Sequence, residues 1–272
     1  MRRRFLDLDF FVPQKQILRA AALLESVGFA AQFEPLEGTH GPTDLAPGQY
    51  SFLREATRTQ IELHTECTLR YFPVPLDFEK MNQRLITVEL CASWLRSFSI
   101  EDSLVMLCVH GTKHFWDRLR WIVDITELIA AQPVDWRLAM RIPGKLRCTR
   151  LLLLGVYLAH RLLDAPLPET VLDRARADSK VEWLAAKVGE KLTGATGSHM
   201  GVLPRAAFRY QSRDGVGDAV WQTMRLATTP TEHDRKSIRL PKALTLFYGL
   251  VLPWNLIIEH GIDWRQGARS DL

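Results

Sequence analysis

The spacing of apolar residues changes near Ser99, and this change limits the folds that the chain can adopt. Before Ser99, polar and apolar residues alternate with a period of two in short stretches, as they do in strands. After Ser99, the apolar residues recur at helical spacing over long stretches. We therefore predict an α+β protein, with a small mixed β-sheet and flanking helices in residues 1–98 and an all-helical domain in residues 99–272.

The same patterns predict the individual elements. The predicted strands cover residues 5–12, 30–34, 50–56 and 59–69, and the last two form a hairpin. A stretch rich in glycine, proline and threonine predicts a loop at 35–48. The predicted helices cover residues 14–27, 99–131, 144–163, 168–192, 218–227 and 240–260.

The composition excludes several classes of protein. A net charge of +4 over 272 residues is compatible with a phosphate-bearing partner but is too small for a dedicated nucleic-acid site. The four cysteines form no CxxC pair, which favours reduced thiols that pack in a cytoplasmic protein over disulfides or a zinc site. No apolar run reaches the ~20 residues that a transmembrane helix needs. We expect a cytoplasmic protein.

Two aspartates stand two residues apart in the first predicted strand. Side chains at this spacing share a face, so Asp7 and Asp9 are expected on one face, with Leu6, Leu8 and Phe10 pointing into the core. Neighbouring carboxylates repel each other, and a cation between them removes this cost. Magnesium is a hard cation that prefers oxygen ligands. The pattern therefore predicts a magnesium site, and the alternative is the solvated face of an edge strand.

The predicted hairpin supplies a third carboxylate. Gln60, Glu62 and His64 share one face of their strand, opposite Ile61 and Leu63. If this strand lies beside the first strand, Glu62 joins Asp7 and Asp9. We then expect His64 to support Glu62 rather than to bind zinc.

Three blocks of sequence carry a resemblance to a known family. They are RFLDLDFFV at residues 4–12, IELH at residues 61–64 and HGTKHFWDRLRWIVD at residues 110–124. These blocks resemble a little-characterised bacterial nucleotidyltransferase family, which is related to the antibiotic nucleotidyltransferases and distantly to DNA polymerase beta. The resemblance extends from Arg4 to about His260. It implies that residues 1–98 form a nucleotidyltransferase-like domain.

The resemblance also implies an activity: magnesium-dependent transfer of a nucleoside monophosphate from a nucleoside triphosphate (NTP) to a hydroxyl group. In such enzymes an Asp-x-Asp pair and a third carboxylate hold up to two magnesium ions. Asp7 and Asp9 would be the metal ligands, and Glu62 would join them and assist deprotonation of the acceptor. Cations beside carboxylates neutralise the charge on the transferred group. The acceptor is expected to be a small molecule, a peptide or a protein.

One element of the nucleotidyltransferase superfamily, to which such families belong, is missing from this sequence. The superfamily carries a Gly-Ser or Gly-Gly turn before the Asp-x-Asp strand, where it grips the triphosphate, but Asp7 stands only six positions after Met1. We therefore expect weak nucleotide binding and an exposed sheet edge at residues 5–12. A late start codon, a truncated gene or an inactive relative would each explain this. The alternative function is a catalytically inactive binding protein with the nucleotidyltransferase fold.

A polar and aromatic stripe follows the predicted helix at 99–131. At 100° per residue the stripe contains His110, Lys113, His114, Asp117, Trp121 and Asp124, opposite the apolar Val105, Cys108, Leu119, Ile122 and Val123. One interpretation is a solvated stripe with a local Lys113–Asp117 ion pair. With the resemblance, the stripe is expected to face the carboxylates, and the nucleotide-binding residues would be Arg4, His110, Lys113, His114 and Asp117.

Within that stripe, Lys113 is expected to contact phosphate, and Trp121 to offer a surface for a base or for packing. His110 and His114 also have the i, i+4 spacing of a helical zinc site, which leaves a metallohydrolase as a lesser alternative. Gly111 stands where the glutamate of an HExxH motif would be, and this weighs against a metallohydrolase.

Overall fold

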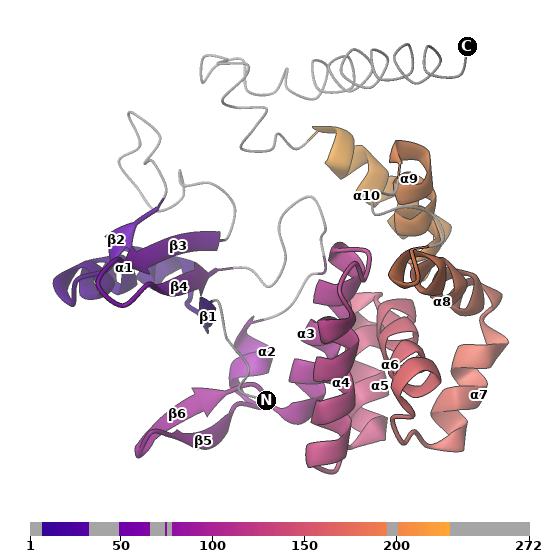
Figure 1. Ribbon diagram of the computed structural model, residues 1–272, viewed down its shortest axis with the longest axis horizontal. Helices are drawn as coiled ribbons and strands as arrows, with labels where there is room; N and C mark the ends of the chain where they lie inside the picture. The colour runs from indigo at the N-terminus through magenta and orange to yellow at the C-terminus, as the bar shows by residue number, and fades with distance from the viewer. Residues whose placement is uncertain (1–6, 33–48, 66–73, 75–77, 195–200, 229–272) are drawn as a thin grey trace. The chain divides into compact units, whose positions relative to one another are not determined.

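The computed structural model describes residues 7–32, 49–65, 74, 78–194 and 201–228 (Figure 1). It divides into two compact units. The sheet unit comprises Met1–Thr65, Leu69–Pro73 and Trp221–Leu272, and the helical unit comprises Glu66–Thr68 and Val74–Val220. Arg4, the predicted loop at 35–48 and the predicted helix at 240–260 lie outside the described residues.

The sheet unit contains a four-stranded mixed sheet with the strand order β1-β4-β3-β2. Its strands are β1 (Asp7–Phe11), β2 (Ala30–Ala31), β3 (Gln49–Arg54) and β4 (Thr59–His64). β1 runs parallel to β4, and the other neighbours are antiparallel. A short 3-10 turn, η1 (Gln14–Gln16), and the helix α1 (Ile17–Ser26) connect β1 to β2. The predicted small mixed sheet is confirmed.

One face of this sheet forms a core with α1. Tyr50 and Phe52 of β3 and Ile61 and Leu63 of β4 are buried against Ile17 of α1. These four sheet residues alternate with polar ones, as the period of two predicts. The opposite face of the central strands is therefore the polar one.

The predicted burial of Leu8 and Phe10 in β1 is wrong. Their Cα partners are Ile61 and Leu63, so both lie on the core face, yet they are 45% and 44% exposed. β1 is an edge strand among the described residues, and the described core is centred on β3, β4 and α1. Leu6 lies outside the described residues.

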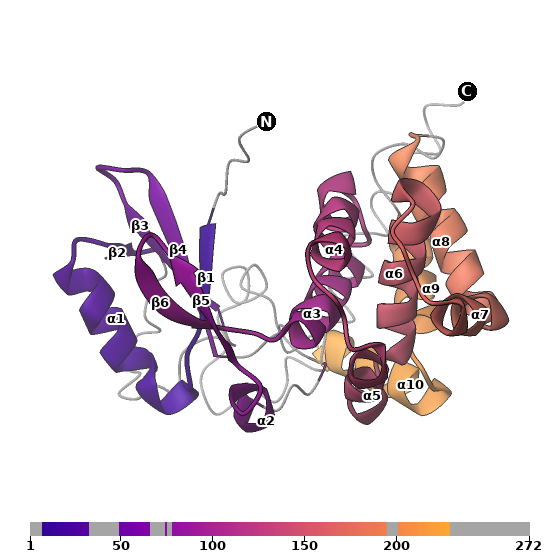
Figure 2. The same cartoon turned by 90° about the horizontal axis from the view of Figure 1, so that it is seen from below.

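The helical unit begins with α2 (Phe78–Asn82) and an antiparallel hairpin of β5 (Ile86–Leu90) and β6 (Ser93–Ser97). Eight helices follow within the described residues, and the last of them, α10, extends into residues assigned to the sheet unit (Figures 1 and 2). They are α3 (Ile100–Lys113), α4 (Leu119–Ala131), α5 (Trp136–Leu146), α6 (Thr149–Leu163), α7 (Glu169–Ala177), α8 (Ser179–Leu192), α9 (Val202–Gln211) and α10 (Val216–Thr228).

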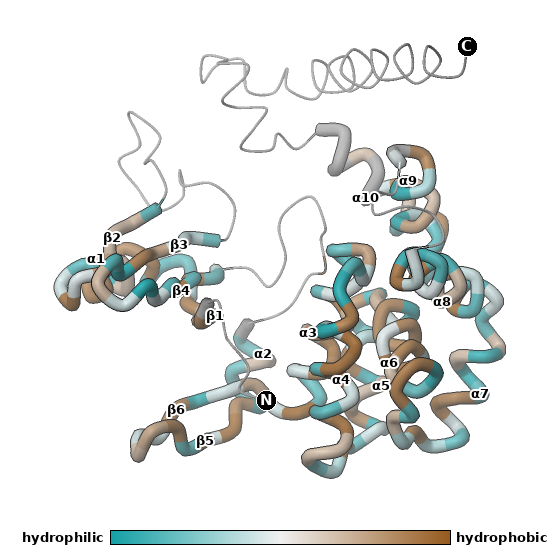
Figure 3. The backbone as a smooth tube through the Cα atoms, viewed as in Figure 1, coloured by the Kyte–Doolittle hydropathy of each residue, from teal (hydrophilic) through white to brown (hydrophobic). Residues whose placement is uncertain are grey.

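α6 is the centre of the helical unit. Every residue from Leu151 to Ala159 is buried, and the helix contacts α3, α4, α5, α7 and α8. Its apolar stretch appears as brown segments in Figure 3. A helix that is apolar on all sides must be covered on all sides, and its neighbours provide this cover.

The single helix predicted at 99–131 is two helices, and the break lies at His114–Arg118. Ser99 caps α3 as predicted, because its side chain accepts a hydrogen bond from the backbone N–H of Asp102. At the other end, the N–H of Trp116 bonds to the carbonyl of Gly111, and the N–H of Phe115 bonds to the carbonyl of Thr112. These two bonds form a Schellman motif, which ends a helix.

The sequence carries no ordinary signal for this break. A Schellman motif usually has glycine in the left-handed conformation, but Phe115 and Trp116 occupy it here, with φ of 55° and 51°. The Trp116 side chain is fully buried, and this burial supports the unusual backbone. As a result Leu119, which was expected on the apolar face, is exposed, whereas Val105, Cys108 and Ile122 are buried as predicted.

Other helix boundaries also differ from the prediction. The predicted helix at 168–192 is divided into α7 and α8 at Asp178, whose side chain caps α8. The helix predicted from residue 144 begins at Thr149, while α5 and α9 were not predicted. Asp135 caps α5, so an N-cap signal was present in the sequence.

Two further expectations concern cysteines and membrane helices. Cys108 and Cys148 are buried free thiols, but Cys91 is exposed rather than packed. Among the helices of the described residues, none has the length and apolar character needed to cross a membrane.

Two glycines allow a matched test of the helix end. A Cβ on Gly111 would overlap the Trp116 ring, whereas a Cβ on Gly189 would meet nothing within 4 Å. We expect Gly111→Ala to lower the free energy of unfolding by about 1–3 kcal/mol through overpacking. Gly189→Ala should raise it by up to ~1 kcal/mol through helix propensity. Urea denaturation of both variants measures this, and equal effects would contradict the packing of Trp116 on Gly111.

Candidate active site

The pairing of β1 with β4 places Asp9 directly beside Glu62. The two residues are Cα partners in the parallel register, and their side chains lie on the polar face of the sheet. One ligand atom from each of Asp9, Glu62 and His64 lies within 4.8 Å of the others. We call these three residues the acidic cluster. No other group of three potential metal ligands occurs in the part of the chain that the structure describes.

Polar neighbours hold the carboxylate of Glu62. Gln49 and Ser51 of β3 and Gln60 of β4 all donate hydrogen bonds to it, over 3.2 Å from Ser51 Oγ and 3.1 Å from Gln60 Nε2. Only 13% of the Glu62 side chain is exposed. Because all three partners are donors, they favour the ionised, acceptor form of Glu62.

His64 joins the two carboxylates. Its Nε2 lies 3.1 Å from Asp9 Oδ1 and 3.5 Å from Glu62 Oε2, and its ring stacks on Phe11 at 5.3 Å between centroids. Burial lowers the pKa of His64, but the hydrogen bonds and negative charges of both carboxylates outweigh it and raise this pKa to about 9. The hydrogen bond from His64 in turn lowers the pKa of Glu62, against the effect of burial. At neutral pH an imidazolium therefore neutralises part of the cluster's charge.

Of the two aspartates in the first block, the structure describes the side chain of Asp9 but not that of Asp7. The Asp9 side chain is 57% exposed, so its oxygens are accessible to a ligand. Asp7 belongs to β1, where its Cα is opposite Gln60, but its side chain lies outside the described part of the chain. The placement of Asp7 beside a metal stays a prediction.

The sequence did not single out Gln49 and Ser51 as partners of Glu62. The signal was nevertheless present. Gln49 and Ser51 alternate with the apolar Tyr50 and Phe52, which places both on the polar face of β3. The predicted strand ends at residues 56 and 59 would place Leu53 opposite Glu62, whereas the observed turn pairs Arg54 with Thr59 and places Ser51 there. Alternation could therefore have assigned these polar residues to the face of the site, but the predicted register could not have paired them with Glu62.

The helix break rearranges the predicted polar stripe. His110 of α3, His114 at its end and Trp121 of α4 form a ring cluster, with centroids 4.7 to 5.4 Å apart. Trp121 is buried, so of its two expected roles it fulfils packing. Asp117 is exposed in the connection between α3 and α4 and lies 3.9 Å from Arg118. The six stripe residues therefore do not share one continuous helix.

A second group of side chains in the helical unit surrounds Phe115, which the sequence did not indicate. Lys191 of α8 and Arg205 and Arg209 of α9 place their cationic groups 5.1 to 5.8 Å from the centre of its ring. The ring also lies 5.6 Å from that of Phe208. Burial lowers the pKa of Lys191, and the charge of Arg205 adds to this effect.

Comparison with known proteins identifies the family. A family model described as "Uncharacterised nucleotidyltransferase" matches residues 1–164, which include the acidic cluster and extend through α6. The chain belongs to this nucleotidyltransferase family. The family predicted from the three sequence blocks is thereby confirmed at this level. No match was found among curated proteins or among solved structures.

The two predicted groups of site residues of this nucleotidyltransferase lie in different units. The acidic cluster belongs to the sheet unit, and His110, Lys113, His114 and Asp117 belong to the helical unit. That these four residues bind the nucleotide opposite the cluster stays a prediction. His110 and His114 are not joined by a third zinc ligand within the described ranges.

The partly buried position of His114 predicts how stability depends on pH. Burial, and then the charge of Lys113, lowers the pKa of His114 below 6.5. The folded state therefore binds fewer protons than the unfolded state. Neutral His114 therefore contributes to the free energy of unfolding above pH 6.5, and this contribution is lost as the pH falls through the lowered pKa. We expect the free energy of unfolding to fall less steeply with acidification in His114→Gln than in the wild type.

Urea denaturation at a series of pH values between about 5 and 8 measures this difference. Lys113→Gln is the matched variant, because it removes one cause of the lowered pKa while retaining His114. The slope of its free energy of unfolding against pH should lie between those of the wild type and His114→Gln. Parallel curves for the wild type and His114→Gln would contradict the prediction.

Proposed function

We propose that this nucleotidyltransferase catalyses magnesium-dependent transfer of a nucleoside monophosphate from an NTP to a hydroxyl group. The observation that carries this proposal is the juxtaposition of Asp9 and Glu62 on the polar face of the sheet. Membership of the family supports the general reaction. The acceptor is a hydroxyl of a small molecule, a peptide or a protein.

The donor set of the acidic cluster fits magnesium. Asp9 and Glu62 offer carboxylate oxygens, which this cation prefers, and the exposed Asp9 leaves room for the water and phosphate ligands that it commonly retains. Asp9, Glu62 and, by the family resemblance, Asp7 would hold the ion. When bound, magnesium supplies positive charge that offsets the negative charge of the transferred phosphoryl group.

The two described carboxylates have different roles in this proposal. Glu62 is held by Gln49, Ser51 and Gln60, so its orientation is fixed before substrate binds. A carboxylate with a lowered pKa is a weak base, and we assign it a hydrogen bond from the acceptor hydroxyl that orients this group and assists its deprotonation. Asp9 is accessible, and its role is to bind the metal.

His64 positions these carboxylates. Its Nε2 proton is shared between Asp9 and Glu62, which lie beside each other and would otherwise repel. The stack on Phe11 restricts the orientation of the imidazole ring. His64 thus keeps both carboxylates at one place on the sheet.

Substitution of the carboxylates tests the proposed function. Asp9→Asn and Glu62→Gln keep the size of each side chain but remove its charge, so we expect each to reduce magnesium-dependent transfer by roughly 10²-fold or more. The assay follows labelled NTP into acceptors of a cell extract, with and without magnesium. Glu55→Gln is the control, since Glu55 is an exposed carboxylate on the β3–β4 turn that pairs with Arg58.

The proposal fails if Asp9→Asn and Glu62→Gln transfer as well as Glu55→Gln. Magnesium-dependent NTP binding by the wild type without transfer would instead support the binding-protein alternative. Calorimetry on the same samples separates these outcomes, because it measures binding whether or not a product forms.

The nucleotide-binding role proposed for Lys113 has its own test. Lys113 offers a positive charge near the end of α3, and we propose that it contacts the triphosphate, together with Arg4, His110, His114 and Asp117. Lys113→Ala should weaken NTP affinity by about tenfold, the loss expected for one charged hydrogen bond. Lys145→Ala, at an exposed position of α5, is the control. Equal affinities by calorimetry would remove Lys113 from the site.

A further inference from the structure

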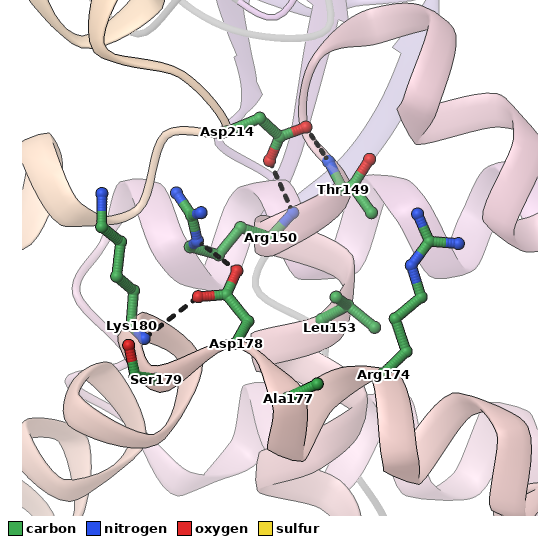
Figure 4. Close-up of a pocket in the computed structure, with 9 residues that line it drawn as sticks. All are labelled: Thr149, Arg150, Leu153, Arg174, Ala177, Asp178, Ser179, Lys180 and Asp214. Carbon is green, nitrogen blue, oxygen red and sulfur yellow. Dashed lines mark hydrogen bonds and ion pairs between the residues drawn. The ribbon is translucent and has the colours of Figure 1, made fainter.

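The helical unit has a cavity that the proposed reaction does not use. It is a pocket wide open to solvent, has a volume of about 540 Å³ and lies where α6 and α8 begin and α7 ends (Figure 4). This volume is within the range of small-molecule sites. All of the residues that line it belong to the helical unit, so the cavity does not depend on the placement of the sheet unit.

The two carboxylates of the cavity are already engaged. Asp214 accepts hydrogen bonds of 2.8 Å from the backbone N–H groups of Thr149 and Arg150, and so caps α6. Asp178 accepts a 2.7 Å bond from Arg150 Nε and a 3.0 Å bond from the backbone N–H of Lys180. These contacts, drawn in Figure 4, fix the walls of the cavity and neutralise Arg150.

Two cationic side chains of the cavity are not engaged. Neither the guanidinium of Arg174 nor the ammonium of Lys180 forms a hydrogen bond or an ion pair with another residue that the structure describes. By contrast, Arg176, two positions after Arg174 on α7, pairs with Glu169 at 3.1 Å. In Figure 4 the two free cations extend on opposite sides of Asp178.

We propose that this cavity binds a small molecule through a phosphate group. The cavity has three cationic and two carboxylate side chains, which leaves an excess of one positive charge. The hydroxyls of Thr149 and Ser179 also line it and add neutral donors. A phosphate monoester carries up to two negative charges and three acceptor oxygens, so it gains more from an unpaired cation than a carboxylate does.

The remaining surface suits the rest of such a ligand. Leu153 and Ala177 line the cavity between the polar groups, and Leu153 is otherwise buried. They offer apolar contact to a short carbon chain or ring attached to the phosphate. The ligand is therefore a phosphate monoester rather than an extended polyanion.

Titration of the full chain with inorganic phosphate tests this proposal. Chemical shifts of backbone amides from residues that line the cavity report occupancy, and acetate at equal ionic strength tests whether a carboxylate binds as well. Divalent cations are removed with a chelator, so that phosphate does not bind through the acidic cluster. We expect saturable shifts with phosphate and weaker ones with acetate.

Matched variants identify the groups responsible. Arg174→Gln and Lys180→Gln should each weaken phosphate binding by about tenfold, which corresponds to the loss of one charged hydrogen bond. The controls are Arg176→Gln on α7 and Lys187→Gln on α8, which remove the same charges from side chains that pair with Glu169 and Glu190. Thermal denaturation checks that all four variants fold.

Three results would overturn the proposal. These are no saturable shift with phosphate, equal binding of acetate, and an equal loss in the control and cavity variants. Glu62→Gln should bind phosphate as the wild type does, because Glu62 does not line the cavity. This result tests phosphate binding in the cavity independently of the proposed transfer reaction.

Discussion

The parallel pairing of β1 with β4 is the constraint on which the candidate site depends. It places Asp9, on a strand near the start of the chain, beside Glu62, which is 53 positions later. Parallel neighbours cannot be joined by a short turn, so the chain must pass through α1, β2 and β3 before β4 forms. A slip of one residue would place Leu8 or Phe10 beside Glu62 and would separate the carboxylates. The buried face of β4 opposes such a slip, because it would also misalign the apolar side of the sheet.

The acidic cluster shows how a sheet tolerates neighbouring negative charges. Glu62 is mostly buried, yet its ionised form is favoured, because three side-chain donors and His64 replace the water that it has lost. Asp9 is largely exposed, so solvent as well as His64 stabilises it. The cluster therefore combines one carboxylate of fixed orientation with one that remains accessible. This difference is the physical basis for giving the two residues different roles.

The sequence predicts the sheet better than the helices, for a physical reason. Alternation in β4 identifies the polar face with Glu62 and His64, and the hairpin turn sets the register with β3. The period of two does not reveal which strand lies at an edge, and for this reason the burial of Leu8 and Phe10 was wrong. Helical spacing continues across a break when tertiary packing ends the helix, as the buried Trp116 does. Strand alternation predicted the three carboxylates and the family resemblance added their roles, but neither indicated the donors on β3.

The left-handed conformation of Phe115 has a consequence for the surface of the helical unit. Glycine would adopt this conformation without steric cost, whereas a bulky residue loses of order 1 kcal/mol or more. Unlike glycine, Phe115 provides an aromatic ring, and the cationic groups of Lys191, Arg205 and Arg209 pack against it. Three positively charged groups therefore lie close together at the C-terminal end of α3. The end of α3 thus carries a local positive electrostatic potential, to which residues 76 to 94 positions after Phe115 contribute.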